Sequence, residues 1–337
     1  MRAWELTEQQ AIERRPLRQV IRPDPRPSPR QIRVRVRVCA ICRTDLHVIE
    51  GDLESKRSPL IPGHQVVGIV DALGAEARRF RIGDRVGIAW LRSTCGRCAD
   101  CARGDENLCR FSEYSGYHAD GGYAELAVVD EAFAYAIPEV FSDADASPLL
   151  CAGIIGYRAL ERAALPLGGR LGLYGFGSSA HITLQVAKHR GAHVYVCTRG
   201  ESHRALARGL GADWVGNAAA APPDPLDSAI LFAPAGALVP VALRALSPGG
   251  TLAIAGIHLS PIPEMTYEPH LFHEKRLTSV EANTRKDGEA LLAIAAQIPI
   301  RPKVTLFSFD QANEALERLK QDGIDGTGVL EISGSHP

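Results

Sequence analysis

The 337-residue chain has the composition of an ordinary globular protein, with 45% hydrophobic residues, 23% charged residues and a formal net charge of −1. A nearly neutral chain gives no support for a nucleic-acid or anionic-membrane partner, and no apolar run reaches the roughly 18 residues that a membrane span needs. The opening MRAWELTEQQ contains acids and lacks the apolar stretch of a secretory signal, so we expect a cytoplasmic protein of about two domains.

The part of the chain before residue 147 is predicted to be rich in β-strands. Residues 33–38 alternate arginine and valine, which is typical of a strand with one buried and one solvated face. We interpret the arginines as a solvated face rather than as a nucleic-acid stripe, because the chain is nearly neutral. Further short β-like runs, broken by Gly and Pro, are VVGIVDALG, RVGIAW and GGYAELAVV.

From about residue 150, helical stretches alternate with short apolar strands, namely RLGLYGF, HVYVC, SAILFA and TLAIAG. This alternation predicts βαβ units and a parallel sheet. Residues 310–332 predict a helix capped by Asp310, a Gly-rich turn and a final strand. The expected class is therefore α/β, with a β-rich part and a parallel-sheet part.

Four of the eight cysteines lie close together, at Cys95, Cys98, Cys101 and Cys109. In a reducing compartment such a cluster indicates a metal site rather than disulfides. The spacing C-x2-C-x2-C-x7-C lets four thiolates close a tetrahedral zinc site, which leaves no position for substrate. We therefore predict a structural zinc, and an iron–sulfur cluster on the same ligands is the alternative.

A glycine-rich turn follows the apolar stretch RLGLY. Gly175, Gly177 and Ala180 form the pattern G-x-G-x-x-A at the start of a helical stretch that ends at Gly191. In a dinucleotide-binding turn, these three positions permit a sharp bend, close approach of a pyrophosphate and packing of helix on strand. The helix N-terminus also offers N–H groups to phosphate. The predicted cofactor contacts from this turn are Gly175, Phe176, Gly177, Ser178, Ser179 and Ala180.

The end of the next strand predicts which nicotinamide cofactor binds. HVYVC runs into Thr198 and Arg199, where an NAD-binding site usually places an acid against the ribose 2′-hydroxyl, and the first acid is Glu201. A hydroxyl followed by a guanidinium suits a 2′-phosphate instead. We therefore favour NADP(H), with NAD(H) bound through Glu201 as the alternative.

Several motifs occur in a fixed order along the chain. They include C-R-T-D-x-H at residues 42–47, P-G-H at 62–64, G-D-R-V at 83–86 and L-L-C-A-G-x-x-G-Y-R-A-L at 149–160. With the cysteine cluster and the glycine turn, they resemble the zinc-containing medium-chain alcohol dehydrogenases over essentially the whole chain. The resemblance implies a discontinuous GroES-like catalytic domain, residues 1–147 and 285–337, and a Rossmann doubly wound parallel-sheet domain that binds the dinucleotide, residues 148–284.

The resemblance also implies a second zinc site, with the ligands Cys42, His64 and Cys151. Two thiolates and one imidazole leave a fourth position open, as a catalytic zinc requires. Such a zinc would act as a Lewis acid on the oxygen of an alcohol or aldehyde, and hydride would pass between the zinc-bound alkoxide and NAD(P)+. The implied protein is a zinc-dependent alcohol dehydrogenase or aldehyde reductase with two Zn2+ per chain and a small-molecule alcohol or aldehyde substrate.

Residues beside these ligands have roles that the resemblance implies. Thr44 would receive the substrate proton, and His47 would form the outer end of a proton relay. Asp45 would orient the ring of His64. One residue departs from the family pattern, because Gln65 follows the ligand His where the family commonly has Glu. We expect this neutral amide to alter ligand exchange without preventing zinc binding.

Four further assignments follow the family pattern. Arg43 would contact the cofactor pyrophosphate, and Trp90 would form a wall of the substrate pocket. The alternative interpretations are a surface cation and a core aromatic. Ile257 and His258 follow a predicted strand at the carboxyl edge of the sheet, where the nicotinamide should lie.

Three competing functions can be weighed on the same residues. A polyol dehydrogenase of the same superfamily often uses a carboxylate as third ligand, which Cys151 argues against. Zinc-free quinone or enoyl reductases lack both sets of metal ligands. A non-catalytic zinc-stabilised nucleotide-binding protein would keep the four clustered cysteines but would not need Cys42, His64 and Cys151 together. By family analogy, the protein is expected to form a homodimer or homotetramer.

Overall fold

The computed structural model describes residues 1–298 and 300–332. The chain divides into two compact units, the first made of Met1–Cys151 with Ala282–Pro337 and the second of Ala152–Glu281. The first junction lies a few residues beyond the predicted limit at residue 147, so that Cys151 belongs to the first unit. The packing of Leu150 on Gly87 of the first unit accounts for this position, because it holds the segment just before Cys151 against the β-rich part.

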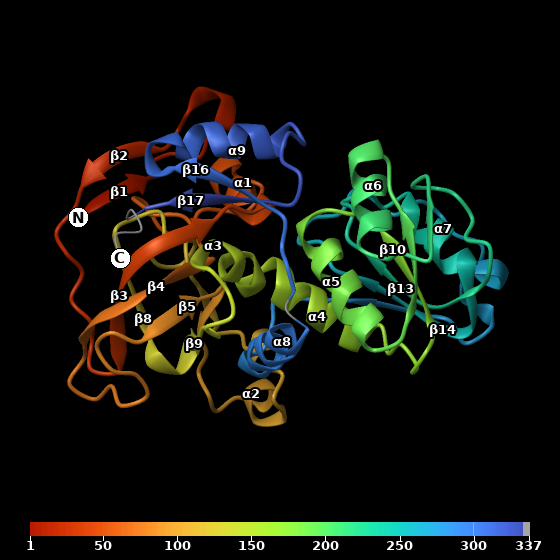
Figure 1. The fold of residues 1–337 in the computed structure, drawn as a ribbon, viewed down its shortest axis with the longest axis horizontal. Coiled ribbons are helices and arrows are strands. Elements are labelled where there is room, and N and C mark those ends of the chain that lie inside the picture. Colours follow the sequence, from red (N-terminus) through yellow and green to blue (C-terminus); the bar gives the residue numbers. More distant parts are fainter. Residues whose placement is uncertain (299, 333–337) are drawn as a thin grey trace. The chain divides into compact units, whose positions relative to one another are not determined.

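The first unit is built around a seven-stranded sheet with the order β16-β17-β3-β4-β5-β9, in which β8 also pairs with β3 (Figure 1). Its strands are β3 (Gln31–Ala40), β4 (Val66–Leu73), β5 (Arg85–Ile88), β8 (Leu126–Asp130), β9 (Ala134–Ala136), β16 (Val304–Ser308) and β17 (Thr327–Glu331). The predicted alternation in β3 is confirmed, because Val34 and Val36 are fully buried whereas Arg35 and Arg37 are exposed. The arginine face is solvated and partly neutralised, for example by the ion pair of Arg37 with Asp143.

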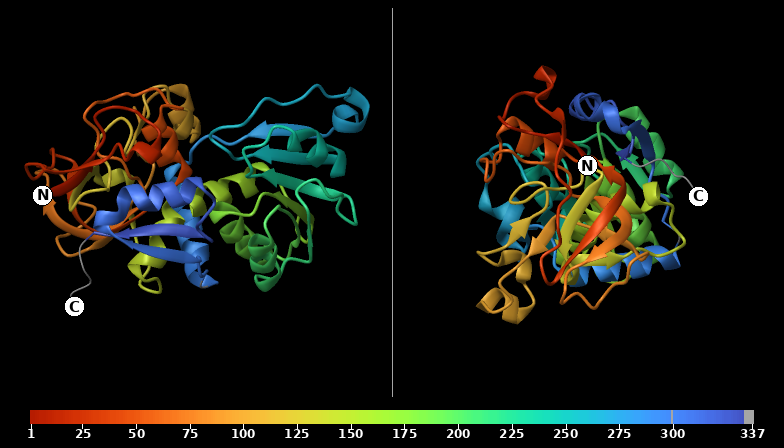
Figure 2. Two further views of the ribbon diagram at one scale, coloured as in Figure 1. Left: turned by 90° about the horizontal axis from the view of Figure 1, so that it is seen from above. Right: turned by 90° about the vertical axis from the view of Figure 1, so that its left-hand side faces the viewer.

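Smaller elements surround this sheet. They are β1 (Arg2–Glu5), η1 (Ile12–Arg14), β2 (Arg18–Ile21), α1 (Arg43–Glu50), β6 (Leu91–Ser93), α2 (Ala99–Arg103), η2 (Glu106–Leu108), β7 (Glu113–Tyr114), η3 (Glu131–Phe133), α3 (Asp143–Ala146), η4 (Ser147–Leu150), α8 (Arg285–Gln297), η6 (Phe309–Gln311) and α9 (Ala312–Lys320). The last helix, α9, lies against β16 and β17, as the left view of Figure 2 shows.

The predicted cap of the C-terminal helix is wrong. Asp310 lies inside the short helix η6, whose N-cap is Ser308, and the N-cap of α9 itself is Gln311, without a side-chain capping bond. The Ser308 and Gln311 side chains form a capping box, in which each side chain bonds the backbone of the other.

The second unit is a six-stranded sheet in which every pair of neighbours is parallel, with the order β12-β11-β10-β13-β14-β15. Its elements are α4 (Ala152–Arg162), β10 (Arg170–Tyr174), α5 (Ser178–His189), β11 (His193–Cys197), α6 (Glu201–Gly209), β12 (Trp214–Gly216), β13 (Leu226–Leu231), α7 (Leu238–Ala245), β14 (Leu246–Ile254), η5 (Glu268–Phe272) and β15 (Arg276–Ser279). The order reverses at β10, which is the doubly wound arrangement of a Rossmann fold. The predicted fold class is thus confirmed. Among the described helices, none combines the length and hydropathy needed to cross a bilayer.

Candidate metal centres and active site

Helix α1 begins directly after Cys42, and this cysteine is its N-cap. Cys42 Sγ accepts a hydrogen bond from the Thr44 N–H at 3.4 Å, and the Asp45 carboxylate accepts one from the Cys42 N–H at 2.8 Å. The side chains of Cys42 and Asp45 each bond the backbone of the other, which forms a capping box in which sulfur takes the place of a hydroxyl. Because a helix N-terminus favours negative charge, the sequence C-R-T-D places Cys42 where a thiolate is stabilised.

His64 lies in a tight loop that only glycine can shape. Gly63 has φ of +95°, and a Cβ there would lie 2.4 Å from Cδ1 of the Tyr123 ring. The His64 ring is fully buried, and its Nδ1 lies 2.9 Å from Asp45 Oδ1. Its Nε2 is buried without a hydrogen-bond partner among the described residues. Because the Nδ1–H donates a hydrogen bond to the Asp45 carboxylate, Nε2 is the nitrogen that could bind a metal.

Cys42, His64 and Cys151 converge, and we call them the three-residue centre. Their ligand atoms all lie within 4.8 Å of one another, and the two sulfurs are 3.9 Å apart. Zn–S bonds of about 2.3 Å at tetrahedral angles put two sulfurs about 3.8 Å apart, so the donor set fits zinc. Within the described part of the chain, no fourth Cys, His, Asp or Glu ligand atom joins this group. The geometry is that of a site with an open coordination position.

The three-residue centre is strongly polarised. Burial would lower the pKa of His64, but the neighbouring Asp45 and Cys42 raise it to about 10. The pKa of Cys42 is held well below its usual range, chiefly by the hydrogen bond with Cys151 and further by His64. That same bond, with burial, raises the pKa of Cys151. A cation that binds here must displace protons, so metal affinity should rise with pH.

The four-cysteine loop, Cys95 to Cys109, forms the second cluster. The sulfurs of Cys95, Cys98, Cys101 and Cys109 all lie within 4.8 Å of one another, with Cys98–Cys101 at 3.5 Å and Cys95–Cys109 at 3.6 Å. The backbone N–H groups of Cys95 and Phe111 point at Cys109 Sγ, at 3.5 and 3.4 Å. Backbone hydrogen bonds from Arg97 and Cys98 lower the pKa of Cys95 to about 6. Four sulfur donors at this spacing fit one tetrahedral metal with no open position.

Glu106 and Arg285 form a hydrogen-bonded ion pair that no sequence pattern predicted, and we call this pair the brace. Glu106 follows the third cysteine of the loop, and its nearly buried carboxylate accepts bonds from the Arg285 backbone N–H at 2.8 Å and from Nε and Nη2 of the guanidinium. The Arg285 guanidinium also lies over the Phe133 ring, 4.5 Å from its centroid. The brace holds the four-cysteine loop to the first turn of α8.

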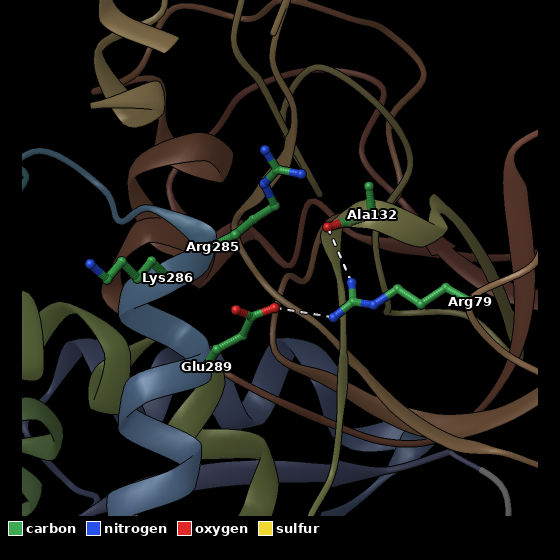
Figure 3. A pocket seen from close by; sticks show the side chains of 5 residues that line it. All are labelled: Arg79, Ala132, Arg285, Lys286 and Glu289. Atoms are coloured by element: carbon green, nitrogen blue, oxygen red, sulfur yellow. Dashed lines mark hydrogen bonds and ion pairs between the residues drawn. The ribbon is translucent and has the colours of Figure 1, made fainter. Parts of the chain in front are cut away.

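Arg285 also lines an open cavity of about 450 Å3 with Arg79, Ala132, Lys286 and Glu289. Figure 3 shows Arg79 reaching across this cavity to the Ala132 carbonyl, at 3.3 Å, and to the Glu289 carboxylate, at 3.2 Å. Because Glu289 and Glu106 engage the two arginines, we interpret the cavity as the edge of a charge-paired brace rather than as an anion site.

We expect Glu106→Gln to lower the free energy of unfolding at pH 7 by roughly 2 kcal/mol, below the cost of breaking a fully buried ion pair because the Arg285 side chain is partly solvated. Burial would raise the pKa of Glu106, but the bonds with Arg285 lower it overall. Its stabilisation is therefore present above the unfolded-state pKa of about 4.3 and is lost as the pH falls through the lower, folded-state pKa. Urea unfolding at a series of pH values measures this.

The matched control for this prediction is Glu289→Gln. Glu289 lies on α8, as Arg285 does, and its substitution removes an exposed ion pair with Arg79. We expect this variant to change stability by about 0.5 kcal/mol or less. An equal loss in both variants, or a Glu106→Gln loss that does not shrink in acid, would contradict the assignment of the brace.

The residues predicted to surround the three-residue centre lie on α1 and in the loop just before β6. Thr44 is on α1, with its hydroxyl oxygen 3.5 Å from Cys42 Sγ. His47 follows one turn later on α1, with Nδ1 2.7 Å from Asp52 Oδ2. Trp90 lies just before β6, and its ring contacts the His64 ring edge-to-face, with centroids 4.9 Å apart.

Arg43 and Trp90 have neighbours that sequence reasoning missed. The Arg43 guanidinium forms an ion pair with Asp322, which lies after α9. The Trp90 ring stacks on Tyr114 and Tyr117, with centroids 4.9 and 5.8 Å apart. These contacts join positions far apart in the chain, and no local pattern predicts them.

The glycine turn lies between β10 and α5 in the second unit. Gly175 has φ of +89°, and its N–H bonds the Cys197 carbonyl at 2.8 Å, which ties the turn to the end of β11. Gly177 is the N-cap of α5, and a Cβ there would meet no protein atom within 4 Å. Phe176 is buried, and Ser178, Ser179 and Ala180 form the first turn of the helix. The backbone beside Gly177 is therefore open to a phosphate at the helix N-terminus.

The end of β11 carries the residues predicted to distinguish the cofactors. Thr198 is buried and Arg199 is exposed. The nearest acid, Glu201, is held by Arg204 at 2.8 Å and Arg208 at 2.9 Å. Arg204 also donates to the Arg199 carbonyl at 3.0 Å, which fixes the turn. The carboxylate that would bind an NAD ribose is thus already engaged within the protein.

Ile257 and His258 follow the end of β14, at the carboxyl edge of the same sheet. Ile257 is 52% exposed.

A chain that combines a Rossmann unit carrying a phosphate-binding turn with a β-rich unit carrying one open and one closed cysteine-containing centre belongs to the class of zinc-dependent, nicotinamide-linked dehydrogenases. Two family models match the chain in agreement with this, the alcohol dehydrogenase GroES-like domain at residues 28–139 and the zinc-binding dehydrogenase at residues 180–297. The chain belongs to the zinc-dependent medium-chain alcohol dehydrogenase family.

Individual relatives span nearly the whole chain. A probable alcohol dehydrogenase of Mycobacterium tuberculosis, AdhA, is 53% identical over 337 residues, which cover 98% of this chain and 97% of the relative. An alcohol dehydrogenase of Geobacillus stearothermophilus is 33% identical, covering 90% of this chain and 92% of the relative. Among solved structures, a cinnamyl alcohol dehydrogenase of Sorghum bicolor superposes with a TM-score of 0.88 at 29% identity, over 99% of this chain and 98% of that one.

Proposed function

We propose that the chain interconverts small-molecule alcohols and aldehydes with NADP(H), using a zinc ion held by Cys42, His64 and Cys151. The observation that carries this proposal is the three-residue centre, in which two sulfurs and one buried, unpartnered nitrogen converge without a fourth protein ligand among the described residues. A zinc there supplies a Lewis acid for the substrate oxygen, and the nicotinamide supplies or accepts the hydride. The four-cysteine loop would hold a second, structural zinc.

Thr44 and His47 are proposed to move the substrate proton. The Thr44 hydroxyl lies beside the ligand Cys42, where its Oγ1 can accept a proton from a substrate hydroxyl at the open coordination position. On the same helix, His47 Nδ1 bonds Asp52, which orients the ring, and we propose that this imidazole forms the outer end of the relay. Asp45 keeps the Nδ1 proton of His64 and so preserves the metal-binding tautomer.

The preference for NADP(H) is supported by the charges at the end of β11. The Arg199 guanidinium is exposed and suits a 2′-phosphate, whereas Glu201 is engaged by Arg204 and Arg208. We propose that the glycine turn, Thr198, Arg199, Ile257 and His258 contact the cofactor. NAD(H) requires Glu201 to leave both arginines, which makes it the second choice.

Trp90 is proposed to limit the substrate pocket. Its ring contacts His64 and is held in a stack with Tyr114 and Tyr117, so it is a rigid wall rather than a mobile side chain. We propose that it narrows the space at the open coordination position. Arg43 remains a proposed contact of the cofactor pyrophosphate, which would then compete with Asp322 for the guanidinium.

The effect of having Gln65 where the family commonly has Glu can be tested by restoring the acid. Gln65 is buried, and its Oε1 has no hydrogen-bond partner among the described residues. We expect Gln65→Glu to change kcat by roughly threefold to tenfold, because a buried charge beside the centre alters ligand exchange at the metal. Bound zinc should be unchanged, as measured by metal analysis and steady-state kinetics. Loss of zinc from this variant would contradict the proposed geometry.

The decisive experiment combines metal analysis with a substrate panel. Purified protein should contain two zinc ions per chain and should consume NADPH with linear, branched or aromatic aldehydes, which nicotinamide absorbance measures. One zinc per chain without turnover would favour the non-catalytic nucleotide-binding alternative, and turnover of polyols alone would favour the polyol dehydrogenase. We further propose that the protein is cytoplasmic and that it forms a homodimer or homotetramer. Light scattering of the purified protein tests the oligomeric state.

A further inference from the structure

We propose that Tyr123 is a positioning residue of the three-residue centre. Its buried hydroxyl fixes the carboxylate of Asp45, and Asp45 in turn fixes the ring of His64 for metal binding. This inference rests on the proposed function of that centre, and it concerns the zinc affinity of one site rather than the identity of the reaction.

The three side chains form a continuous buried chain of hydrogen bonds. The Tyr123 hydroxyl donates to Asp45 Oδ2 at 3.0 Å, and the His64 Nδ1–H donates to Asp45 Oδ1 at 2.9 Å. Tyr123 and His64 are 0% exposed and Asp45 is 2% exposed, so water cannot replace a lost partner without entering the core. Asp45 Oδ2 also accepts the Cys42 N–H at 2.8 Å. The Asp45 carboxylate is thus hydrogen-bonded to two of the predicted metal ligands, Cys42 and His64. The Tyr123 hydroxyl donates the third hydrogen bond to this carboxylate.

Tyr123 is held in place by two backbone hydrogen bonds and by the packing of its ring. Its backbone N–H donates to the Pro62 carbonyl at 2.9 Å, and its carbonyl accepts the Trp4 N–H at 2.8 Å. The ring lies on Gly63, the residue before His64. Tyr123 therefore acts on His64 in two ways, through the ring that shapes the loop and through the hydroxyl that holds Asp45. Tyr123→Phe separates the two, because it keeps the ring and removes only the hydroxyl.

The hydroxyl matters because a buried carboxylate needs all its donors. With one donor lost, the Asp45 carboxylate can rotate about its remaining bonds to Cys42 and His64, and the His64 ring loses its fixed direction. Partners that orient a metal-bound histidine typically change metal affinity by about 10–100-fold. Since Tyr123 acts through Asp45, we expect the lower end of that range.

The test compares zinc affinity at the two centres of one molecule. Zinc is titrated from wild type and from Tyr123→Phe with a chromophoric chelator, and the four-cysteine loop serves as the internal reference. We expect about tenfold weaker zinc binding at the three-residue centre and unchanged binding at the four-cysteine loop. Cobalt substituted at the three-residue centre should show a shifted visible absorption band, because its nitrogen ligand is less well oriented.

Tyr195→Phe is the matched control. The Tyr195 hydroxyl also donates to a carboxylate, Asp224, at 2.9 Å, but this pair lies in the second unit. We expect its loss to leave zinc binding at both centres as in wild type. A double variant with Asp45→Asn should bind zinc hardly less well than Asp45→Asn alone, because Tyr123 acts through Asp45.

Three results would overturn the proposal. These are unchanged zinc affinity and cobalt spectrum in Tyr123→Phe, equal weakening at both centres, and additive effects of Tyr123→Phe and Asp45→Asn. Each of them leaves the proposed function intact if wild type still binds two zinc ions and reduces aldehydes. Wild type without zinc at Cys42, His64 and Cys151 would instead remove the proposed function itself.

Discussion

Cys151→Ser is expected to retain one zinc ion per chain and to lose oxidoreductase activity by about 10³-fold or more, because a Lewis acid contributes several kcal/mol to the transition state. Serine has nearly the shape of cysteine, but its hydroxyl is not a thiolate and binds zinc weakly. The Cys42 and Cys151 sulfurs are 3.9 Å apart, so removing one leaves a single thiolate and one imidazole as zinc ligands. Zinc per chain is measured by elemental analysis, and activity by NADPH consumption.

The control for this variant is Cys197→Ala. Cys197 is a buried cysteine at the end of β11, and burial raises its pKa to about 12, so it behaves as a small apolar side chain. It belongs to neither cluster and should leave both zinc ions and turnover in place. A Cys151→Ser protein that keeps two zinc ions, or that turns over at the wild-type rate with one, would refute the catalytic role of the three-residue centre.

Arg199→Ala is expected to lower kcat/KM for NADPH by about 30–100-fold and to leave the value for NADH within about threefold, because a hydrogen bond to a charged group contributes roughly 2–3 kcal/mol. The guanidinium is the exposed cation at the end of β11, beside a turn that Arg204 holds in place. The matched control is Arg244→Ala, an exposed arginine in the last turn of α7. The measurement is a pair of steady-state titrations with the same aldehyde.

The prediction for Arg199 has a clear contrary outcome. A wild type that strongly prefers NADH, with Arg199→Ala unchanged for both cofactors, would show that Glu201 is released from Arg204 and Arg208 and binds the ribose. In that case Glu201→Gln should lower kcat/KM for NADH, which distinguishes a misassigned cofactor from an inactive preparation.

The sequence was most informative where the chemistry is local. Two residues separate Cys95 from Cys98 and Cys98 from Cys101, so a single loop brings them together and their spacing alone predicts a metal site. Gly175 and Gly177 likewise define a turn within one βα unit. Cys42, His64 and Cys151 lie on separate segments, and only the resemblance to a family connected them before the fold did.

Contacts made by tertiary packing were not predictable in the same way. Nothing near Glu106 or Tyr123 indicates that the first bonds Arg285 and the second bonds Asp45, because each partner comes from a distant part of the chain. The misplaced cap is different, since the sequence S-F-D-Q at residues 308–311 contains the capping-box pattern S-x-x-Q and a local signal was available.

The brace between Glu106 and Arg285 also orders events during synthesis. Arg285 is 179 positions after Glu106, so at about 5–20 residues per second the ribosome delivers it roughly 10–40 s after the cysteine loop is complete. The nascent loop is therefore complete before its ionic anchor exists. If the loop holds zinc as proposed, its four sulfurs can bind the metal before Arg285 secures the loop.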